Sequence, residues 1–172
     1  DKNNSQINKG KYALNANGDL AGTITMISEG SQYGQKARVE KMQPTEKEAY
    51  YKEFWDNINN LKINKNIFFN DKEKVILTEN MEIAADNYGK ISNGKMIFVV
   101  NAYNQYTGSV KRIRNRKTPF EIQRGYYDTD EISISLPEGF TIESLPQNFE
   151  SNTKFGEYKT EIIKKDDKNL VY

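Results

Sequence analysis

The residues that could do chemistry in this chain are its carboxylates, lysines, tyrosines and serines, because the 172-residue sequence contains neither cysteine nor histidine. Without cysteine, the chain has no disulfide, no thiolate metal site and no cysteine nucleophile. Without histidine, it lacks the commonest general base, the Ser-His-Asp triad and the usual zinc ligand. The composition therefore excludes the most frequent hydrolytic and zinc-dependent mechanisms.

The first candidate contact residues lie in a basic segment, KRIRNRK, at residues 111–117. In an extended conformation, Arg112, Arg114 and Arg116 would share one face, where they could bind phosphate or an acidic partner. A solvated linker, or an edge strand that its charges protect from aggregation, is the favoured interpretation. The formal net charge is only +1, so one short patch does not indicate nucleic-acid binding. Arg112 and Arg114 are kept as candidate contact residues.

Tyrosines form the second candidate group: Tyr103, Tyr106, Tyr126 and Tyr127. They could build an aromatic platform of the kind that carbohydrate-binding sandwiches use. Packing at the junctions of loops and strands, with each hydroxyl group reaching water, is the favoured interpretation. If this part of the chain has a contact surface, we expect Tyr126 and Tyr127 to form it.

Acidic residues offer two further kinds of site. Asp128-Thr129-Asp130-Glu131 could supply oxygen ligands to Ca²⁺, but the run lacks the spacing and the glycine of an EF-hand loop. A turn with exposed carboxylates is favoured there, and also at Asp166-Asp167. Paired carboxylates for glycoside hydrolysis depend on a separation in space that the sequence does not show. We therefore expect no metal, no cofactor and no enzymatic activity, with a carboxylate hydrolase as a third hypothesis.

The elements that must position these residues begin with a hairpin. Apolar residues alternate up to Asn17-Gly18 and again after it, which predicts strands near 11–16 and 20–28. Asn-Gly between two alternating runs is a strong hairpin signal, since a type I′ turn needs two positive φ angles. Residues 31–42 are ambiguous and could form a short helix.

The clearest local prediction is an amphipathic helix at about 45–61. Thr45-Glu46-Lys47-Glu48 reads as a capping box, and Pro44 ends any helix before it. One face carries apolar residues at helical spacing: Tyr51, Phe54, Trp55, Ile58 and Leu61. We expect Trp55, as part of this stripe, to lie in the core.

Strand patterns follow from residue 62 to residue 100. Short apolar runs are separated by polar turns, and Asn93-Gly94 gives a second hairpin signal. The unbroken apolar run at residues 96–100 predicts a central strand that is covered on both faces.

The last part of the chain alternates again. Residues 118–146 read as a strand, a tyrosine-bearing connection, a second strand and a hairpin bounded by Leu-Pro pairs. Ile132, Ile134 and Leu136 would face the core, and Phe140 would return to it after a turn at residues 137–139. A strand near 157–164, a turn at 165–169 and a strand that begins at Leu170 complete the pattern.

These elements predict a β-rich α+β fold with antiparallel sheets, sandwich-like, and one clear amphipathic helix. A change to a polar, aromatic and then basic composition after residue 100 suggests a boundary. We divide the chain into residues 1–115, a β-rich region with the helix, and residues 116–172, a small antiparallel β-domain; the two could share one core. No stretch approaches the roughly 18 apolar residues of a membrane span.

Several short motifs resemble, in their order, a known bacterial family. They are Arg116-Lys117-Thr118-Pro119-Phe120, Asp130-Glu131-Ile132, Leu136-Pro137-Glu138-Gly139-Phe140, Glu143-Ser144-Leu145-Pro146 and Phe155-Gly156-Glu157-Tyr158. The family is the C-terminal accessory β-domain of transglutaminase-like proteins from Bacteroidetes, which follows a papain-like core. The part before Arg116 is similar to the region just after that core, with Gly18-Asp19, Arg38 and the helix at 45–61.

The resemblance implies an accessory role without catalysis. The Cys-His-Asp triad of the core has no counterpart in a chain without cysteine and histidine. We expect a domain of an exported protein, in the periplasm or at the cell surface, that packs on or orients the core. Its expected partners are the upstream domains of the parent protein, with a glycan or protein ligand as a further candidate, and we expect no nucleic acid and no membrane insertion. The alternative is a carbohydrate-binding β-sandwich module.

Overall fold

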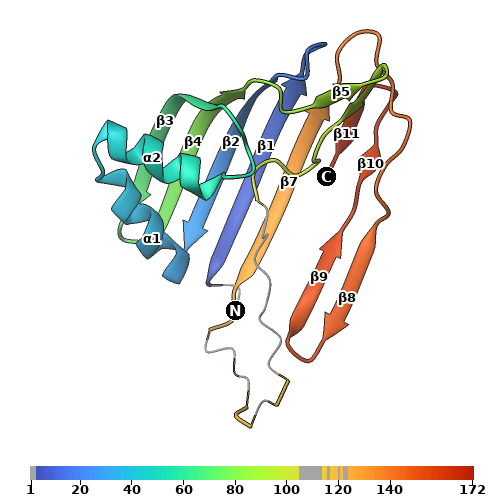
Figure 1. Cartoon of the computed structure of the whole chain (residues 1–172). Helices are drawn as coiled ribbons and strands as arrows, with labels where there is room; N and C mark the ends of the chain where they lie inside the picture. Colours follow the sequence, from blue (N-terminus) through green and yellow to red (C-terminus); the bar gives the residue numbers. More distant parts are fainter. Residues whose placement is uncertain (1–2, 105–113, 116, 120, 122–123) are drawn as a thin grey trace.

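A computed structural model of the chain describes residues 3–104, 114–115, 117–119, 121 and 124–172 (Figure 1). Within these residues the largest sheet has the strand order β10-β11-β7-β1-β2-β4-β3. Its strands are β1 (Ser5–Leu14), β2 (Leu20–Glu29), β3 (Leu61–Asp71), β4 (Ile76–Ala85), β7 (Tyr127–Ser135), β10 (Ile163–Lys164) and β11 (Asn169–Val171). Neighbouring strands are antiparallel except β1 and β7, which are parallel. The prediction of a β-rich fold is confirmed, while the main sheet is mixed rather than antiparallel throughout.

Two helices and two strand pairs complete the described elements. They are α1 (Ser31–Glu40), α2 (Pro44–Phe54), the pair β5 (Lys90–Ser92) and β6 (Lys95–Ile97), and the pair β8 (Phe149–Thr153) and β9 (Gly156–Thr160). Both helices lie against the same face of the main sheet, over β2, β4 and β3 (Figure 1).

The main sheet contains strands from both predicted domains: β1 to β4 come from residues 1–115, and β7, β10 and β11 come from residues 116–172. The division into two domains stays a prediction.

The hydrophobic core lies between the helices and this covered face of the main sheet. Because side chains alternate along a strand, one set from each strand points toward the helices. The largest fully buried side chains are Tyr51 and Trp55 from the helical segment, Leu20, Ile24 and Met26 from β2, Leu77, Met81 and Ile83 from β4, Ile132 and Ile134 from β7, Leu170 from β11, and Tyr103. The predicted inward face of β7 and the core position of Trp55 are confirmed.

The opposite face of the main sheet is called the open face below. The strand register places these residues on it: Ile7, Lys9 and Lys11 of β1; Thr23, Thr25 and Ile27 of β2; Thr78, Asn80 and Glu82 of β4; and Lys65, Ile67 and Phe69 of β3. In the part of the chain that the structure describes, neither helix covers this face (Figure 1). It mixes hydroxyl, amide, charged and apolar side chains.

The first hairpin forms at the predicted place, but its turn is of another type. β1 and β2 are joined by residues 15–19, and Leu14 pairs with Leu20. Gly18 has a φ of 84°, whereas Asn17 is not among the residues with positive φ, so the type I′ prediction is wrong here. At the second signal, Asn93 (φ 49°) and Gly94 (φ 74°) both have the left-handed φ angles that a type I′ turn requires. A two-residue connection needs that turn, while a five-residue loop does not.

β1 also begins six residues before the predicted strand. Its first half, SQINKG, has no strong strand preference of its own. It is extended because it lies between β2 and β7 and hydrogen-bonds with both. Tertiary pairing therefore overrides the weak local signal.

The helix predicted at 45–61 is shorter in the structure and starts at a different cap. α2 spans Pro44–Phe54, and the N-cap is Gln43, whose backbone N–H donates to Glu46 Oε2 at 3.0 Å. The predicted box at Thr45 and Glu48 is wrong, because proline favours the first helical position and so places the cap before itself. The chain leaves the helix at Trp55. Ile58 lies in the following turn and Leu61 begins β3, and both side chains are buried. The stripe of buried apolar residues therefore continues beyond the end of the helix.

Residues 31–42, which the sequence left ambiguous, contain the helix α1, so the prediction of one clear helix is incomplete. The prediction of a central strand at 96–100 is wrong. β6 ends at Ile97, which is 72% exposed. The Tyr12 hydroxyl donates to the carbonyl oxygens of Val99 (3.2 Å) and Val100 (2.8 Å). The segment therefore crosses the covered face instead of pairing within the main sheet.

The C-terminal elements agree with the prediction in part. The acidic run at residues 128–131 lies within β7, so the predicted turn there is wrong. No strand is assigned at residues 118–119 or 136–148, and Phe120 lies outside the described residues. The strand predicted near 157–164 is divided into β9 and β10, which pair with β8 and β11.

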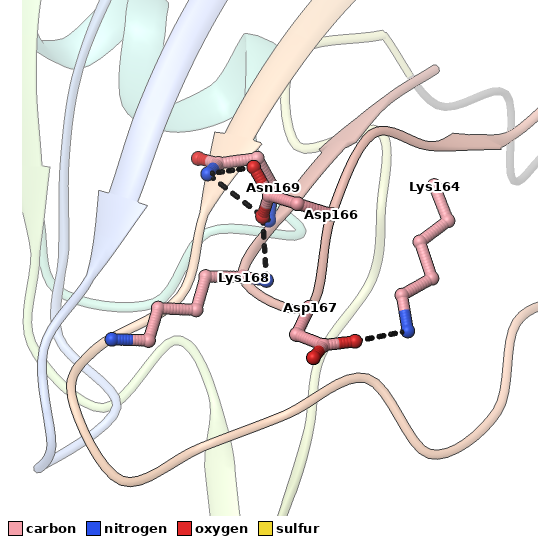
Figure 2. A network of polar contacts seen from close by, with 5 residues as sticks. All are labelled: Lys164, Asp166, Asp167, Lys168 and Asn169. Atoms are coloured by element: carbon pink, nitrogen blue, oxygen red, sulfur yellow. Dashed lines mark hydrogen bonds and ion pairs between the residues drawn. The ribbon is translucent and has the colours of Figure 1, made fainter.

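The predicted turn between β10 and β11 is confirmed. Asp166 Oδ1 accepts hydrogen bonds from the backbone N–H groups of Lys168 and Asn169, both at 2.8 Å, and the Asn169 side chain donates to the same carboxylate (Figure 2). The hydrogen bond from the Asn169 side chain and the one from the Lys168 amide lower the pKa of Asp166. Lys164 pairs with Asp167 at 2.7 Å. These carboxylates therefore close a turn, as aspartates often do.

Candidate functional site

The predicted contact residues are Arg112, Arg114, Tyr126 and Tyr127. Arg112 lies outside the described residues, and Arg114 is exposed in a turn. Tyr126 and Tyr127 are both exposed where the chain enters β7. Successive side chains of an extended strand point to opposite sides, but Tyr126 precedes β7, so this rule does not fix how the two rings lie.

The hypothesis of an aromatic platform also includes Tyr103 and Tyr106. Tyr103 is fully buried in the core, and its carbonyl oxygen accepts a hydrogen bond of 2.6 Å from Trp55 Nε1. Tyr106 lies outside the described residues. Tyr103 therefore packs in the core, as expected, but its hydroxyl group lies 3.4 Å from the backbone oxygen of Lys11 instead of reaching water.

Exposed aromatic side chains do gather on the β8–β9 pair, called the aromatic ribbon below. Phe149, Phe155 and Tyr158 are each more than half exposed. The register pairs Phe149 with Thr160 and Tyr158 with Ser151, so Phe149 and Tyr158 share one face. Their ring centroids are 6.2 Å apart. The aromatic ribbon forms its own two-stranded sheet beside the main sheet (Figure 1).

The aromatic ribbon has few attachments to the main sheet among the described residues. The Ile162 N–H donates to Asn148 Oδ1 at 2.9 Å, which ties the two ends of the ribbon together. Tyr158 interacts through a side-chain hydrogen bond with Tyr172, which follows β11. An isolated two-stranded hairpin is only marginally stable in water. The exposed aromatic side chains of the ribbon are therefore a candidate contact surface.

The open face carries a shallow hollow of about 260 Å³. Its lining residues come from three adjacent strands: Thr23, Ile24 and Thr25 of β2, Lys65, Ile67 and Phe69 of β3, and Asn80, Met81 and Glu82 of β4. The Thr25 hydroxyl donates to Asn80 Oδ1 at 2.6 Å, and Lys65 Nζ lies 3.5 Å from Glu82 Oε1. The sequence indicated these strands but not the hollow, because the lining residues meet only through the register of the main sheet.

On the covered face, a lysine and a glutamate are buried together. Lys36 of α1 is 4% exposed and Glu79 of β4 is 1% exposed, and their charged groups lie 3.7 Å apart. The Tyr51 hydroxyl donates to Glu79 Oε1, and Lys36 Nζ lies 4.3 Å from the ring centroid of Phe54. Burial lowers the pKa of Lys36, while the Glu79 carboxylate acts in the opposite direction. The amine, carboxylate and phenol have acid–base chemistry, but their burial leaves them without access to a substrate.

A second polar cluster surrounds Asp130 of β7. Its carboxylate accepts hydrogen bonds from the side-chain amides of Asn8 (2.7 Å), Asn101 (2.9 Å) and Asn104 (3.1 Å). These amide N–H groups satisfy the carboxylate, so the cluster holds residues 101–104 on the covered face. Burial raises the pKa of Asp128, which also accepts a hydrogen bond from Gln32.

Two further features bear on the class of site. Among the residues that the structure describes, no group of three or more acidic, histidine or cysteine side chains is arranged to hold a metal ion. None of the described helices is both long enough and apolar enough to span a membrane. The exposed features left as candidates are the aromatic ribbon and the hollow on the open face.

Comparison with known proteins identifies one part of the chain. Residues 94–172 match a family described as a domain of unknown function with a solved structure, DUF3858. Searches among curated proteins and among solved structures found no match. A domain of this family is therefore found in the C-terminal part of the chain. The matched region contains the aromatic ribbon, Tyr126 and Tyr127, but none of the residues that line the hollow.

Proposed function

We propose that this chain is a non-catalytic accessory and interaction module of a larger exported bacterial protein, where it packs on or orients a transglutaminase-like core. The order of the sequence motifs supports the relation to that class of protein, and the DUF3858 match at residues 94–172 supports a domain of this general kind. The proposed location is the periplasm or the cell surface.

The observation that carries this proposal is the aromatic ribbon. Phe149, Phe155 and Tyr158 are exposed, and Phe149 and Tyr158 share one face of the strand pair. By contrast, Tyr12, Tyr51, Trp55 and Tyr103 are buried in the core. Aromatic side chains are enriched at the energetic centres of protein interfaces. We infer that the aromatic ribbon contacts an upstream domain of the parent protein.

The alternative, a carbohydrate-binding module that uses Tyr126 and Tyr127, has less support. The two side chains are exposed, but no ring contact joins them to each other or to the aromatic pair Phe149–Tyr158 among the interactions that the described residues show. A contact of either tyrosine with a protein partner would be compatible with the accessory role.

The test is a titration of the separately expressed upstream core with the whole chain, followed by calorimetry. Replacing both Phe149 and Tyr158 by alanine should weaken binding by roughly 30-fold or more, since aromatic residues at the centre of an interface often contribute about 2 kcal/mol or more. The matched control is Phe69→Ala. Phe69 is 59% exposed and Phe149 is 57% exposed, but Phe69 lies on the open face.

An upstream core that does not bind the wild-type chain would refute the docking role. Equal binding by the ribbon variant and the wild type would show that the aromatic ribbon is not the contact. Circular dichroism of each variant establishes that it is folded before the affinities are compared.

A further inference from the structure

The hollow on the open face is built from three rows of side chains that cross β2, β4 and β3. One row contains Thr23, Glu82 and Lys65, and the next contains Thr25, Asn80 and Ile67. A third row ends in Phe69, which lies opposite Thr78. Alternate residues of a strand are about 6.6 Å apart, so the hollow extends about 13 Å along β3 from Lys65 to Phe69. Its length suits a ligand with more than one ring.

The two sides of the hollow differ in polarity. Ile67 and Phe69 of the edge strand β3 give an exposed apolar border, to which Phe69 contributes an aromatic ring. Thr23, Thr25 and Asn80 give hydroxyl and amide groups on the neighbouring strands. A bound molecule therefore needs an apolar patch against β3 and hydrogen-bonding groups over β2 and β4.

The charges indicate a neutral ligand. Lys65 and Glu82, the residues of the lining that ionise, form an ion pair at 3.5 Å, so the lining has no net formal charge. Lys9 and Lys11 lie one strand further, opposite Thr25 and Thr23, and Lys9 is also opposite Glu131 of β7. A site for phosphate or for nucleic acid would need an uncompensated cluster of basic side chains.

We propose that this hollow binds a neutral oligosaccharide, a role separate from the docking of the aromatic ribbon. A sugar ring combines an apolar face, which packs on Phe69, with equatorial hydroxyl groups, which hydrogen-bond with Thr25, Asn80 and the Lys65–Glu82 pair. The hollow is shallow, which suits a chain lying across the main sheet better than an apolar small molecule that must be largely enclosed. An extended peptide would instead add to the free edge of β3 through backbone hydrogen bonds.

The experiment uses the whole chain and a panel of neutral hexasaccharides of glucose, xylose and mannose, with an oligogalacturonate as the acidic member, measured by calorimetry. At least one neutral hexasaccharide should bind, and Phe69→Ala should weaken that binding roughly ten-fold or more because the stacking ring is lost. Phe149→Ala, an exposed phenylalanine outside the hollow, should leave it unchanged. Thr25→Val, which keeps the side-chain shape but removes the hydroxyl group, should weaken binding to a smaller degree.

Each other outcome overturns the proposal. These outcomes are no binding of any neutral hexasaccharide, binding only of the acidic member, or binding that Phe149→Ala abolishes and Phe69→Ala does not. A further outcome is that the wild type binds no sugar and Phe69→Ala weakens association with the upstream core, in which case the hollow is a protein contact. The variants of the aromatic ribbon test the docking role independently, so either proposal can fail without the other.

Discussion

The covered face of the main sheet and the aromatic ribbon both contain tyrosine and phenylalanine, but they place these residues in opposite environments. On the covered face, Tyr51 and Tyr103 are fully buried, and their polar groups take part in hydrogen bonds. On the aromatic ribbon, Phe149 and Tyr158 share a face that is more than half exposed. The same residue types therefore stabilise the fold in one region and are available for a partner in the other. Substitutions in the two regions should differ accordingly.

The largest expected effect is on the buried charges of the covered face. Glu79→Ala removes the partner of Lys36 and the acceptor of the Tyr51 hydroxyl. Removing one member of a buried pair leaves the other charge without compensation, so the free energy of unfolding should fall by about 3–5 kcal/mol. Urea denaturation measures this change.

The control for that prediction replaces both members, with Lys36→Met and Glu79→Leu together. An apolar pair of similar volume is often as stable as the buried ion pair, so the double variant should recover most of the loss. A loss of less than about 1 kcal/mol in Glu79→Ala would contradict the account of the cluster.

The second-largest effect is expected at alkaline pH, which should destabilise the covered face. Burial raises the pKa of Tyr12, Tyr51 and Tyr103 above the ordinary value of 10.0. Because the folded pKa is the higher one, their contribution to stability is fully present below pH 10 and is lost as the pH rises above it. The loss should reach up to roughly 1.4 kcal/mol for each tyrosine and each pH unit. The lowered pKa of Lys36 acts in the opposite direction, but only up to about pH 10.5.

Urea unfolding at pH 9, 10 and 11 measures this dependence. Tyr103→Phe removes one of the buried titrating groups and should reduce the slope above pH 10 by up to roughly 1.4 kcal/mol for each pH unit. A wild-type protein that is as stable at pH 11 as at pH 9 would show that these hydroxyl groups are not buried from water.

A smaller effect is expected where Tyr103 approaches β2. A Cβ atom added to Gly22 would lie 2.5 Å from the Tyr103 hydroxyl and 2.5 Å from the backbone oxygen of Lys11. Gly22→Ala should therefore reduce the free energy of unfolding by about 1–3 kcal/mol through overpacking.

The matched control is Gly34→Ala in α1. A Cβ atom at Gly34 meets nothing within 4 Å, and alanine is a better helix former than glycine, so this change should stabilise by about 0.5–1 kcal/mol. Thermal unfolding of both variants should shift in opposite directions. A shift in the same direction would mean that Tyr103 does not lie over β2 as described.

The smallest effect is expected on the aromatic ribbon. Phe149→Ala removes a side chain that is 57% exposed, and surface substitutions of this kind usually change the free energy of unfolding by about 0.5 kcal/mol or less. A loss above about 2 kcal/mol in a urea melt would place Phe149 in the packing of the chain and end the contrast between the two regions.

The sequence predicted the strands and the core where the signal is local. The side-chain periods of strands and helices were enough to predict the buried face at Ile132 and Ile134 and the helical stripe that contains Trp55. The limits of α2 were missed because Pro44 moves the cap and because the stripe continues into a turn. The polar first half of β1 was missed because its extended form depends on two neighbouring strands.

The candidate sites were harder to predict, for a related reason. The hollow joins Thr25, Asn80 and Ile67, which meet only through the pairing of three strands. The exposure of Phe149 and Tyr158 follows from the position of the aromatic ribbon outside the main sheet, and a tally of aromatic residues does not show it. A cue was present in Phe155-Gly156, a turn between two short runs with aromatic residues.

Amide hydrogen exchange of the whole chain, with and without the proposed upstream core as a separately expressed protein, tests the contrast between the two regions most directly. Without the core, amides of β1, β2 and β4 should exchange slowly and those of β8 and β9 much faster, because few contacts hold the aromatic ribbon. Addition of the core should slow exchange in β8 and β9 and leave the slow amides of the main sheet unchanged. Exchange in β8 and β9 that is as slow as in β1 without the core, or that does not change when the core binds, would contradict the account.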